Sequence, residues 1–165
     1  MITNFDIEEL SKRLELPLLG IVNKDRLDTI EKQLGSYYIN MQNYDEGEGT
    51  HWVYARLYCD SDRDSDNDDD EYGVVKCLYF DPFGLDMPKE VEEYFKEFKP
   101  IAYSKKQIQN IRSSQCGWYC VACDYELTHR PIGETYLEDY ESFLEMWSDE
   151  PDENLKLLKS YFKPL

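Results

Sequence analysis

The first residues of the chain carry apolar side chains about one helical turn apart, at Phe5, Ile7, Leu10 and Leu14. Asn4 is a favoured N-cap residue and Pro17 cannot continue a helix, so a first helix is expected between them. Helical periodicity or an apolar run of helical length predicts further helices over residues 25–34, 88–98, 115–127, 135–147 and 153–162. The helix over 115–127 is apolar enough to be buried.

Short runs rich in aromatic and β-branched residues lie between these helices and predict strands. They cover residues 18–22, 36–42, 50–58, 72–80 and 100–103. Strands grouped in the middle of the chain, with helices before and after them, indicate an α+β fold with a central antiparallel sheet flanked by helices. The chain has 165 residues, which is about one domain's worth, so we expect residues 1–165 to form a single domain.

The formal net charge of −17 is concentrated in two segments. Residues 60–71 contain eight acidic residues and one arginine, and residues 131–155 contain nine acidic residues and no base. The first segment lies between two predicted strands and is interpreted as an acidic hairpin loop, while the second begins an acidic, helical C-terminal segment over 131–165. The rest of the chain is close to neutral. So acidic a protein is a poor candidate for non-specific binding to DNA or to an anionic membrane.

Five cysteines, three of them clustered, do not form the even-numbered framework of a secreted disulfide-rich domain. The first residues lack the basic region and the apolar run of a signal peptide. No apolar stretch approaches the ~20 residues that a membrane helix needs. We therefore expect a protein that is not secreted, that works in a reducing compartment and that does not interact with a membrane.

Three residues with reactive side chains lie where helices or strands are expected to begin or end. His51 opens an aromatic strand, Asp81 ends the next strand in the turn sequence Asp-Pro-Phe-Gly, and Cys116 lies where a polar loop becomes an apolar helix. A helix N-terminus stabilises a thiolate, and a carboxylate beside a histidine holds the imidazole in one tautomer. The three residues together predict a thiolate–imidazolium nucleophile. Gly117, next to the thiol, lets a chain or a substrate approach closely.

Each of these residue types also has a commoner structural use. A histidine at a strand end is more often structural, and an aspartate before proline usually starts a turn. His129, near the end of the cysteine helix, is expected to cap that helix or to face solvent. Cys120 and Cys123 follow Cys116 by four and seven residues, so they are expected on the buried face of the helix as packing thiols.

Two patterns are also compatible with a metal ion. Cys116, Cys120 and Cys123 have the C-x3-C-x2-C spacing of an iron–sulfur cluster, but the motif stands late in the chain, with only 42 residues after it. The acidic residues of 60–71 fall on the ligand positions of a calcium loop, yet the sixth position is Ser65 instead of glycine, and strands flank the loop. We therefore expect no metal cofactor.

Taken in order, the motifs resemble those of adenain, the adenovirus maturation protease, and of the wider group that includes the SUMO-deconjugating proteases. They are Gly-Thr-His-Trp ending at Trp52, Phe-Asp-Pro-Phe-Gly around Asp81, and Gln109 followed seven positions later by Cys-Gly-Trp-Tyr-Cys at Cys116. The chain order His, Asp, Gln, Cys is a rearrangement of the papain order. The likeness covers residues 4–130 and leaves the tail unmatched.

The resemblance implies a papain-like fold with the catalytic cysteine at the N-terminus of a buried helix. It implies that Cys116 is the nucleophile, His51 the general base that later protonates the leaving amine, and Asp81 the residue that orients His51. Gln109 is implied to donate its side-chain amide to an oxyanion hole, together with the backbone N–H of Cys116.

The same resemblance implies the substrate and the setting. The approach to the thiol is a narrow groove in such proteases, which implies cleavage after glycine, with Trp52 and Gly117 in contact with substrate. The reaction is amide hydrolysis through a thioester acyl-enzyme. The implied source is a large DNA virus, a virophage or a related element, and the implied substrates are capsid or core precursor proteins. A monomer that acts in the virion or in the cytoplasm of the host cell is expected.

Adenain uses DNA and a basic viral peptide as cofactors and is itself basic. The charge of −17 argues against DNA here, whereas a basic peptide activator is compatible with the acidic segments. Two alternatives to a maturation protease stay open at this point. One is a protease that removes ubiquitin-like modifiers, which rests on the shared fold. The other is a non-catalytic acidic binding module on the same scaffold, which rests on the charge imbalance.

Overall fold

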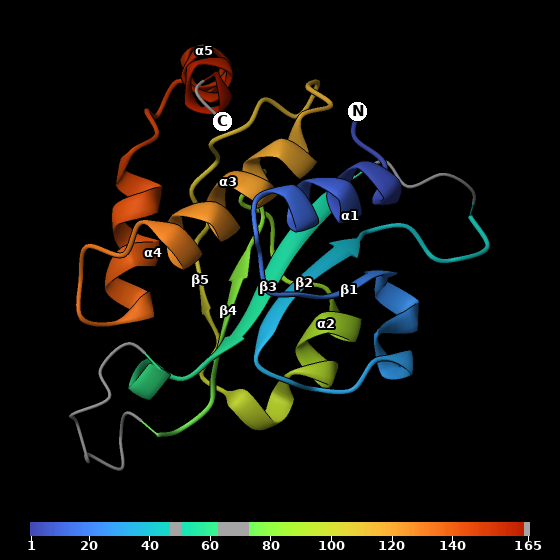
Figure 1. Cartoon of the computed structure of the whole chain (residues 1–165). Coiled ribbons are helices and arrows are strands. Elements are labelled where there is room, and N and C mark those ends of the chain that lie inside the picture. The colour runs from blue at the N-terminus through green and yellow to red at the C-terminus, as the bar shows by residue number, and fades with distance from the viewer. Residues whose placement is uncertain (47–50, 63–72, 164–165) are drawn as a thin grey trace.

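The computed structural model of the chain describes residues 1–46, 51–62 and 73–163 (Figure 1). The helices and strands follow one another as α1 (Asn4–Arg13), β1 (Leu18–Asn23), η1 (Lys24–Thr29), β2 (Gly35–Asn40), β3 (Trp52–Tyr58), η2 (Asp60–Asp62), β4 (Lys76–Phe80), α2 (Lys89–Tyr94), η3 (Lys96–Phe98), β5 (Ala102–Tyr103), α3 (Cys116–His129), α4 (Tyr136–Glu145) and α5 (Pro151–Phe162), where η marks a 3-10 helix.

The five strands form one sheet in the order β1-β2-β3-β4-β5, with helices on both sides, which confirms the predicted α+β class. The expectation of an antiparallel sheet holds for the central strands β2, β3 and β4. The outer strands differ, because β1 pairs with β2 and β5 pairs with β4 in parallel. The connections β1–β2 and β4–β5 each contain helical turns that carry the chain back to the same end of the sheet, and a parallel pair needs such a crossover.

Both faces of the sheet are buried, because alternate side chains of each strand point to opposite layers. Tyr38, Tyr54 and Phe80 belong to the core on the side of α1, α3, α4 and α5. Tyr37, Val53 and Tyr79 face the smaller core that Leu27, Val91 and Phe95 close on the side of η1 and α2. Strand β3 is the middle strand of the sheet and is buried along its whole length.

Two local predictions need correction. The N-cap of α1 is Thr3 and not Asn4, because the Thr3 side chain accepts the N–H of Asp6 while the Asp6 carboxylate accepts the N–H of Thr3. The predicted helix over 25–34 is the shorter 3-10 helix η1. Only Leu27 is buried in η1, so there is little apolar face to support a longer helix.

The two acidic segments have different outcomes. The predicted acidic loop over 60–71 lies mostly outside the described residues, and so does the calcium-loop pattern within it. The first residue of the loop, Asp60, is described, and its side chain accepts the backbone N–H of Tyr136 at 3.0 Å. The C-terminal segment is helical as expected, with α4 and α5. Through the described residues, no helix combines the length and the apolar character that crossing a membrane requires.

Candidate active site

Three ends of secondary structure meet at one end of the sheet (Figure 1). His51 directly precedes β3, Asp81 directly follows β4, and Cys116 is the first residue of α3. Strands β3 and β4 are antiparallel, with Tyr54 opposite Phe80, so the start of one lies beside the end of the other. The topology therefore brings together three residues that are 30 and 35 positions apart in the sequence.

His51 and Asp81 form a buried, hydrogen-bonded pair. The Nε2 atom of His51 lies 2.8 Å from Oδ1 of Asp81, which also accepts the backbone N–H of Phe83 at 2.8 Å. The Phe83 ring is stacked on the imidazole, with centroids 4.1 Å apart and planes at 9°. The carboxylate and the aromatic ring thus fix the plane and the rotation of the imidazole, and the face of Phe83 favours its cationic form.

The turn after Asp81 places a second candidate residue as well. The backbone N–H of Gly84 donates to the carbonyl oxygen of Asp81, and Gly84 has a φ of 69°, where a Cβ would meet the Lys105 carbonyl oxygen at 2.5 Å. The carbonyl oxygen of Pro82 accepts the N–H groups of Ile108 and Gln109, each at 3.0 Å. One tight turn therefore positions both the carboxylate of Asp81 and the backbone of Gln109.

The thiol of Cys116 lies against the first residues of β3. Its Sγ atom accepts the backbone N–H of Trp52 at 3.3 Å, and only 1% of Cys116 is exposed. No side chain caps α3 at Gln115. The N–H groups of Trp118 and Tyr119 donate to the carbonyl oxygen of Gln115. Those of Cys116 and Gly117 have no partner within the helix, so the start of α3 places positive partial charge beside the thiol.

The imidazole of His51 is arranged to carry a proton. Burial by itself lowers the pKa of His51, but the hydrogen bond to Asp81, the hydrogen bond to Cys116 and the charges of both groups outweigh it and raise the pKa to about 9. Nδ1 is buried without a hydrogen-bond partner, and since Asp81 takes Nε2, Nδ1 is the nitrogen that is left to exchange a proton with a neighbouring group.

Gln109 is connected to the other candidates through the backbone. It is fully buried, and its side-chain Nε2 donates to the carbonyl oxygen of Ser113, three residues before Cys116, at 3.0 Å. An amide nitrogen has two hydrogens, so one donor is left for another acceptor. Gln109 therefore lies between the turn after Asp81 and the start of α3; its role in an oxyanion hole stays a prediction.

Trp52 and Gly117 contact a residue that the sequence analysis did not select. The indole Nε1 of Trp52 donates to the carbonyl oxygen of Ile2 at 3.2 Å. The Ile2 side chain packs over Gly117 so closely that it leaves no room for a Cβ there. No periodicity or motif marks Ile2, so this contact was not predictable. Contact of Trp52 and Gly117 with substrate stays a prediction.

The remaining candidates have structural positions. Cys120 and Cys123 are fully buried, and their pKa values lie well above the usual value, first because of burial, as expected for packing thiols. His129 ends α3, where its Nε2 lies 2.7 Å from the carbonyl oxygen of Leu14 at the end of α1. None of the five cysteines, all of which lie in the described residues, forms a disulfide bond. Within the described ranges, no three metal-ligating side chains are grouped so that they could hold an ion.

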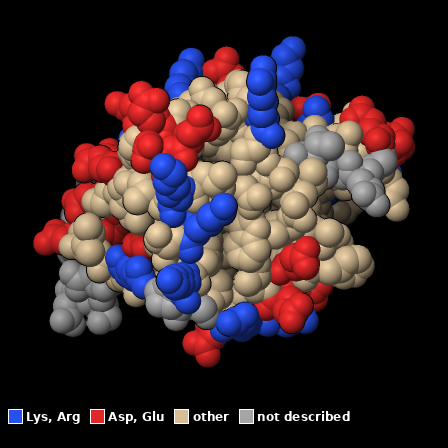
Figure 2. Space-filling model, turned by 90° about the horizontal axis from the view of Figure 1, so that it is seen from above, with Lys and Arg blue, Asp and Glu red and all other residues tan. Residues whose placement is uncertain are grey.

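The end of the molecule that carries the site is not uniformly acidic. Figure 2 views this end directly and shows acidic side chains mainly toward its edges, with lysine and arginine side chains among them and uncharged surface between.

Comparison with known proteins identifies the fold. No protein-family model and no curated protein matches the sequence. Among solved structures, the chain is similar to the ASFV pS273R protease, with a TM-score of 0.57 and 13% identity over 93% of this chain and 64% of that chain. A selenomethionine form of the same protease has a TM-score of 0.48 and 14% identity over 90% and 68% of the two chains.

These values support a coarse conclusion. The chain has the fold of a viral protease, with which it shares 13% of its residues, and it spans 64% of that neighbour's length. So low an identity shows the fold alone. Catalysis and specificity must be argued from the residues of this chain.

Proposed function

We propose that this chain is a cysteine endopeptidase with Cys116 as its nucleophile. The observation that carries the proposal is the arrangement of His51, hydrogen-bonded to Asp81 at 2.8 Å, beside a cysteine thiol at the uncapped start of α3. The raised pKa of His51, about 9, keeps the imidazole protonated at neutral pH, as a thiolate–imidazolium pair requires. The fold shared with a protease is an independent argument for the same chemistry.

The proposed reaction proceeds in two steps. The thiolate of Cys116 attacks the carbonyl carbon of the scissile amide, forming the C–S bond while the carbonyl electron pair moves to oxygen. The oxyanion accepts hydrogen bonds from the Cys116 N–H and the free Gln109 amide hydrogen. The C–N bond then breaks, and His51 gives its proton to the departing amine. In the second step His51 takes a proton from water, hydroxide attacks the thioester, and the thiolate leaves.

We further propose that the substrates are viral capsid or core precursor proteins cut after glycine. Two arguments support this. The motif likeness to adenain extends over residues 4–130, and the fold neighbour is a viral protease. In addition, the site is closely covered, because Cys116 is 1% exposed and Ile2 packs on Gly117. A residue without a side chain is the easiest to accommodate beside such a thiol.

The test is digestion of candidate structural precursors and of glycine-containing peptides by the wild type and by Cys116→Ala, with mass spectrometry of the cut ends. The proposal expects cuts after glycine by the wild type and none by the variant. Equal cutting by both proteins would overturn it. Ubiquitin and SUMO conjugates are tested in parallel, because their cleavage in place of the precursors would assign the chain to the deconjugating class. No cleavage by the wild type, with Cys116 unreactive, would favour a binding module.

A further inference from the structure

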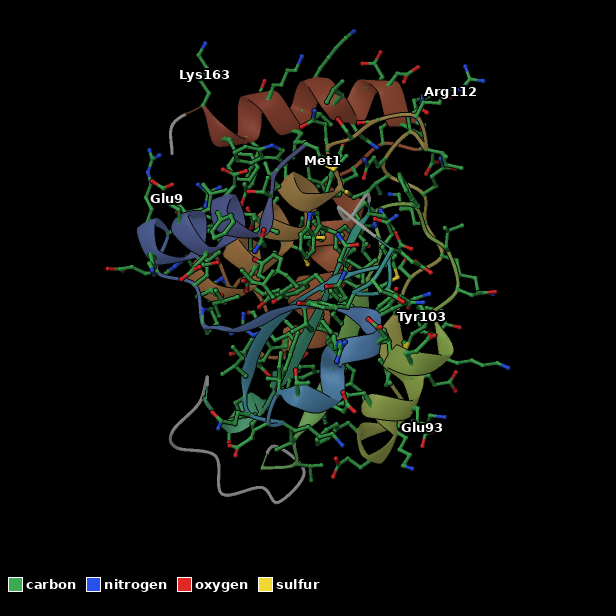
Figure 3. All side chains as sticks on the ribbon, turned by 90° about the vertical axis from the view of Figure 1, so that its right-hand side faces the viewer. Met1, Glu9, Glu93, Tyr103, Arg112 and Lys163 are labelled. Carbon is green, nitrogen blue, oxygen red and sulfur yellow. The ribbon has the colours of Figure 1, made fainter. Side chains whose placement is uncertain are left out.

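Gln109 lies in a segment with almost no regular structure of its own. Residues 104–115 connect β5 to α3 without a helix or a strand. Such a segment takes its shape from the elements that it contacts. Figure 3 shows Arg112 of this segment near one end of α5, while Lys163 marks the other end of that helix. The C-terminal helices therefore stand where they can hold the segment that carries Gln109.

A buried asparagine of α5 makes the central contact. Asn154 is fully buried, and its Nδ2 donates to the carbonyl oxygen of Ile108 at 2.9 Å and to that of Ser148 at 2.8 Å. Its Oδ1 accepts the backbone N–H of Ser148 at 2.8 Å. Both amide hydrogens and the oxygen are thus used. A buried amide costs stability unless it is satisfied, and this one is satisfied only in the observed arrangement.

The peptide bond between Ile108 and Gln109 is consequently held from both sides. Its carbonyl oxygen accepts from Asn154, and its N–H donates to the carbonyl oxygen of Pro82 in the turn after Asp81. The six atoms of a peptide group lie in one plane, so holding its oxygen and its hydrogen also fixes the position of the Gln109 Cα. The Gln109 side chain starts from this atom, so the position of its amide depends on the held peptide.

Two other contacts join the same segment to the C-terminal helices, but neither acts on this peptide. Lys106 Nζ donates to the carbonyl oxygens of Leu144 and Trp147 at the end of α4, at 2.9 and 2.6 Å. Asn110 Nδ2 donates to Asp152 Oδ1 at 3.0 Å on the surface. Among the described contacts of α5, the bond from Asn154 is the one that reaches the peptide of Gln109.

We propose that Asn154 is a positioning residue for the oxyanion hole: it holds the Ile108–Gln109 peptide so that the Gln109 amide meets the oxyanion as it forms. The inference rests on the proposed function. It also gives a function to the C-terminal segment, in which the sequence analysis found no motif. Asn154 acts only through Gln109, so its loss slows attack on an amide but leaves the Cys116–His51 pair intact.

The test compares Asn154→Ala, Gln109→Ala and the double variant on a peptide ending in glycyl-aminomethylcoumarin. Loss of one oxyanion donor typically costs about 10²–10³ in kcat, and we expect Gln109→Ala to fall in that range. Asn154→Ala is expected to lower kcat about 10-fold, with KM nearly unchanged, and to add nothing in the Gln109→Ala background. Losses that multiply in the double variant would overturn the proposal.

Two readouts separate positioning from general damage. Iodoacetamide labelling of Cys116 should be as fast in Asn154→Ala as in the wild type, because it does not use the oxyanion hole; a proportional slowing would reject the proposal. Hydrogen exchange should accelerate in residues 104–115 and stay unchanged in β3 and β4. Asp152→Ala, which removes only the surface contact, should keep wild-type kcat. If Asn154→Ala does not fold, Asn154→Asp replaces it, since it keeps the acceptor for Ser148 but loses the donor to Ile108.

The exchange measurement does not depend on peptide cleavage. If the wild type cleaves nothing, the protease proposal fails, and hydrogen exchange still decides whether Asn154 holds the segment. If the wild type cleaves and exchange is unchanged in Asn154→Ala, the positioning proposal fails alone.

Discussion

Two buried polar clusters lie along the interface between the central sheet and α3, and they are built for different purposes. The site cluster consists of His51, Asp81 and Cys116. The anchor cluster consists of Arg56 and Asp124 with their hydroxyl partners Ser36, Tyr38, Tyr54 and Thr128. Each cluster contains a carboxylate paired with a basic side chain, and each basic side chain comes from β3 or from the residue before it. They differ in how many donors the carboxylate accepts and in the chemistry of the nitrogen that is left without a hydrogen-bond partner.

The carboxylate of the anchor cluster is saturated with donors. Asp124 is fully buried and accepts hydrogen bonds from Ser36, Tyr38 and Tyr54 at 2.7–2.8 Å, with Arg56 at 3.4 Å. The pKa values of Tyr38 and Tyr54 are well above the usual value, because of burial and then because of the Asp124 charge, so both hydroxyls keep their protons. A network of this kind binds α3 to the sheet, and Nε of Arg56, which is buried without a hydrogen-bond partner, belongs to a guanidinium that does not give up its proton.

In the site cluster the ring nitrogen without a partner belongs to the histidine. Asp81 uses one oxygen to hold His51 and Phe83, while Nδ1 of His51 is buried without a hydrogen-bond partner. The contrast teaches that the two buried ion pairs differ in the chemistry of the nitrogen left without a partner: Nδ1 of His51 can exchange a proton, whereas the guanidinium of Arg56 keeps its charge. It predicts that changes in the site cluster alter activity and that changes in the anchor cluster alter stability.

The largest expected effect is that of Asp81→Asn on activity. An amide carries no negative charge to stabilise the imidazolium, so kcat/KM at neutral pH should fall by as much as about 10⁴-fold, the loss that the same change causes in a serine-protease triad, with little loss of fold. The alkaline limb of the pH profile should also move from about pH 9 toward the ordinary histidine value of 6.5, because Asp81 is the main group that raises the pKa of His51. Steady-state kinetics from pH 5 to 10 measures both changes.

Asp124→Ala should produce the opposite result. It removes the carboxylate and leaves the Arg56 charge buried without its partner, which should lower the free energy of unfolding by about 4 kcal/mol. Chemical denaturation measures this loss. The kcat/KM of the protein that stays folded should change little. A drop in activity as large as that of Asp81→Asn, without loss of stability, would abolish the distinction between the clusters.

The site cluster and the anchor cluster should also differ in how much they make stability depend on pH. His51 has a higher pKa in the folded state, about 9, than in the unfolded chain, about 6.5, so the folded protein binds more protons in this window. Its contribution to stability is complete below pH 6.5 and is lost as the pH rises to 9, on the order of 3 kcal/mol. His51→Gln should remove this slope from denaturation curves. Arg56 stays charged throughout, so the anchor cluster contributes no such slope.

The smallest expected effect is that of Phe83→Leu. Leucine keeps the backbone N–H that donates to Asp81 but loses the aromatic face stacked on His51, which is worth about 0.5–2 kcal/mol to a cation. The pKa of His51 should fall by about 0.4–1.5 units. The alkaline limb of kcat/KM measures the shift. An unchanged limb would show that Phe83 only packs against the imidazole.

The sequence predicted the site cluster because its members stand at the ends of elements with strong local signals. His51 opens an aromatic strand, Asp81 begins an Asp-Pro-Phe-Gly turn, and Cys116 begins an apolar helix. Such signals are local, and the antiparallel pairing of β3 and β4 then brings the first two together. The helices of the second half were also predicted, with shifts of a few residues at their ends.

The contacts that were not predicted are those between residues far apart in the sequence. Ile2 packs on Gly117, and Asn154 binds the carbonyl oxygen of Ile108, yet neither residue differs from an ordinary surface position in hydrophobic pattern. Likewise, nothing in the sequence around Asp124, which lies five residues before the end of α3, indicates which buried residues it contacts. Parallel pairing at the sheet edges was missed for the same reason, since it depends on where the crossovers return the chain.

The central claim is that His51 activates Cys116, and the rate of labelling of each cysteine by iodoacetamide at neutral pH tests it most directly. Peptide mass spectrometry follows all five thiols in one experiment, with Cys120 and Cys123 as buried controls on the same helix. Cys116 should be labelled stoichiometrically and faster than any other cysteine in the wild type, and this advantage should disappear in His51→Ala. Equal labelling of Cys116 in the two proteins would contradict the account.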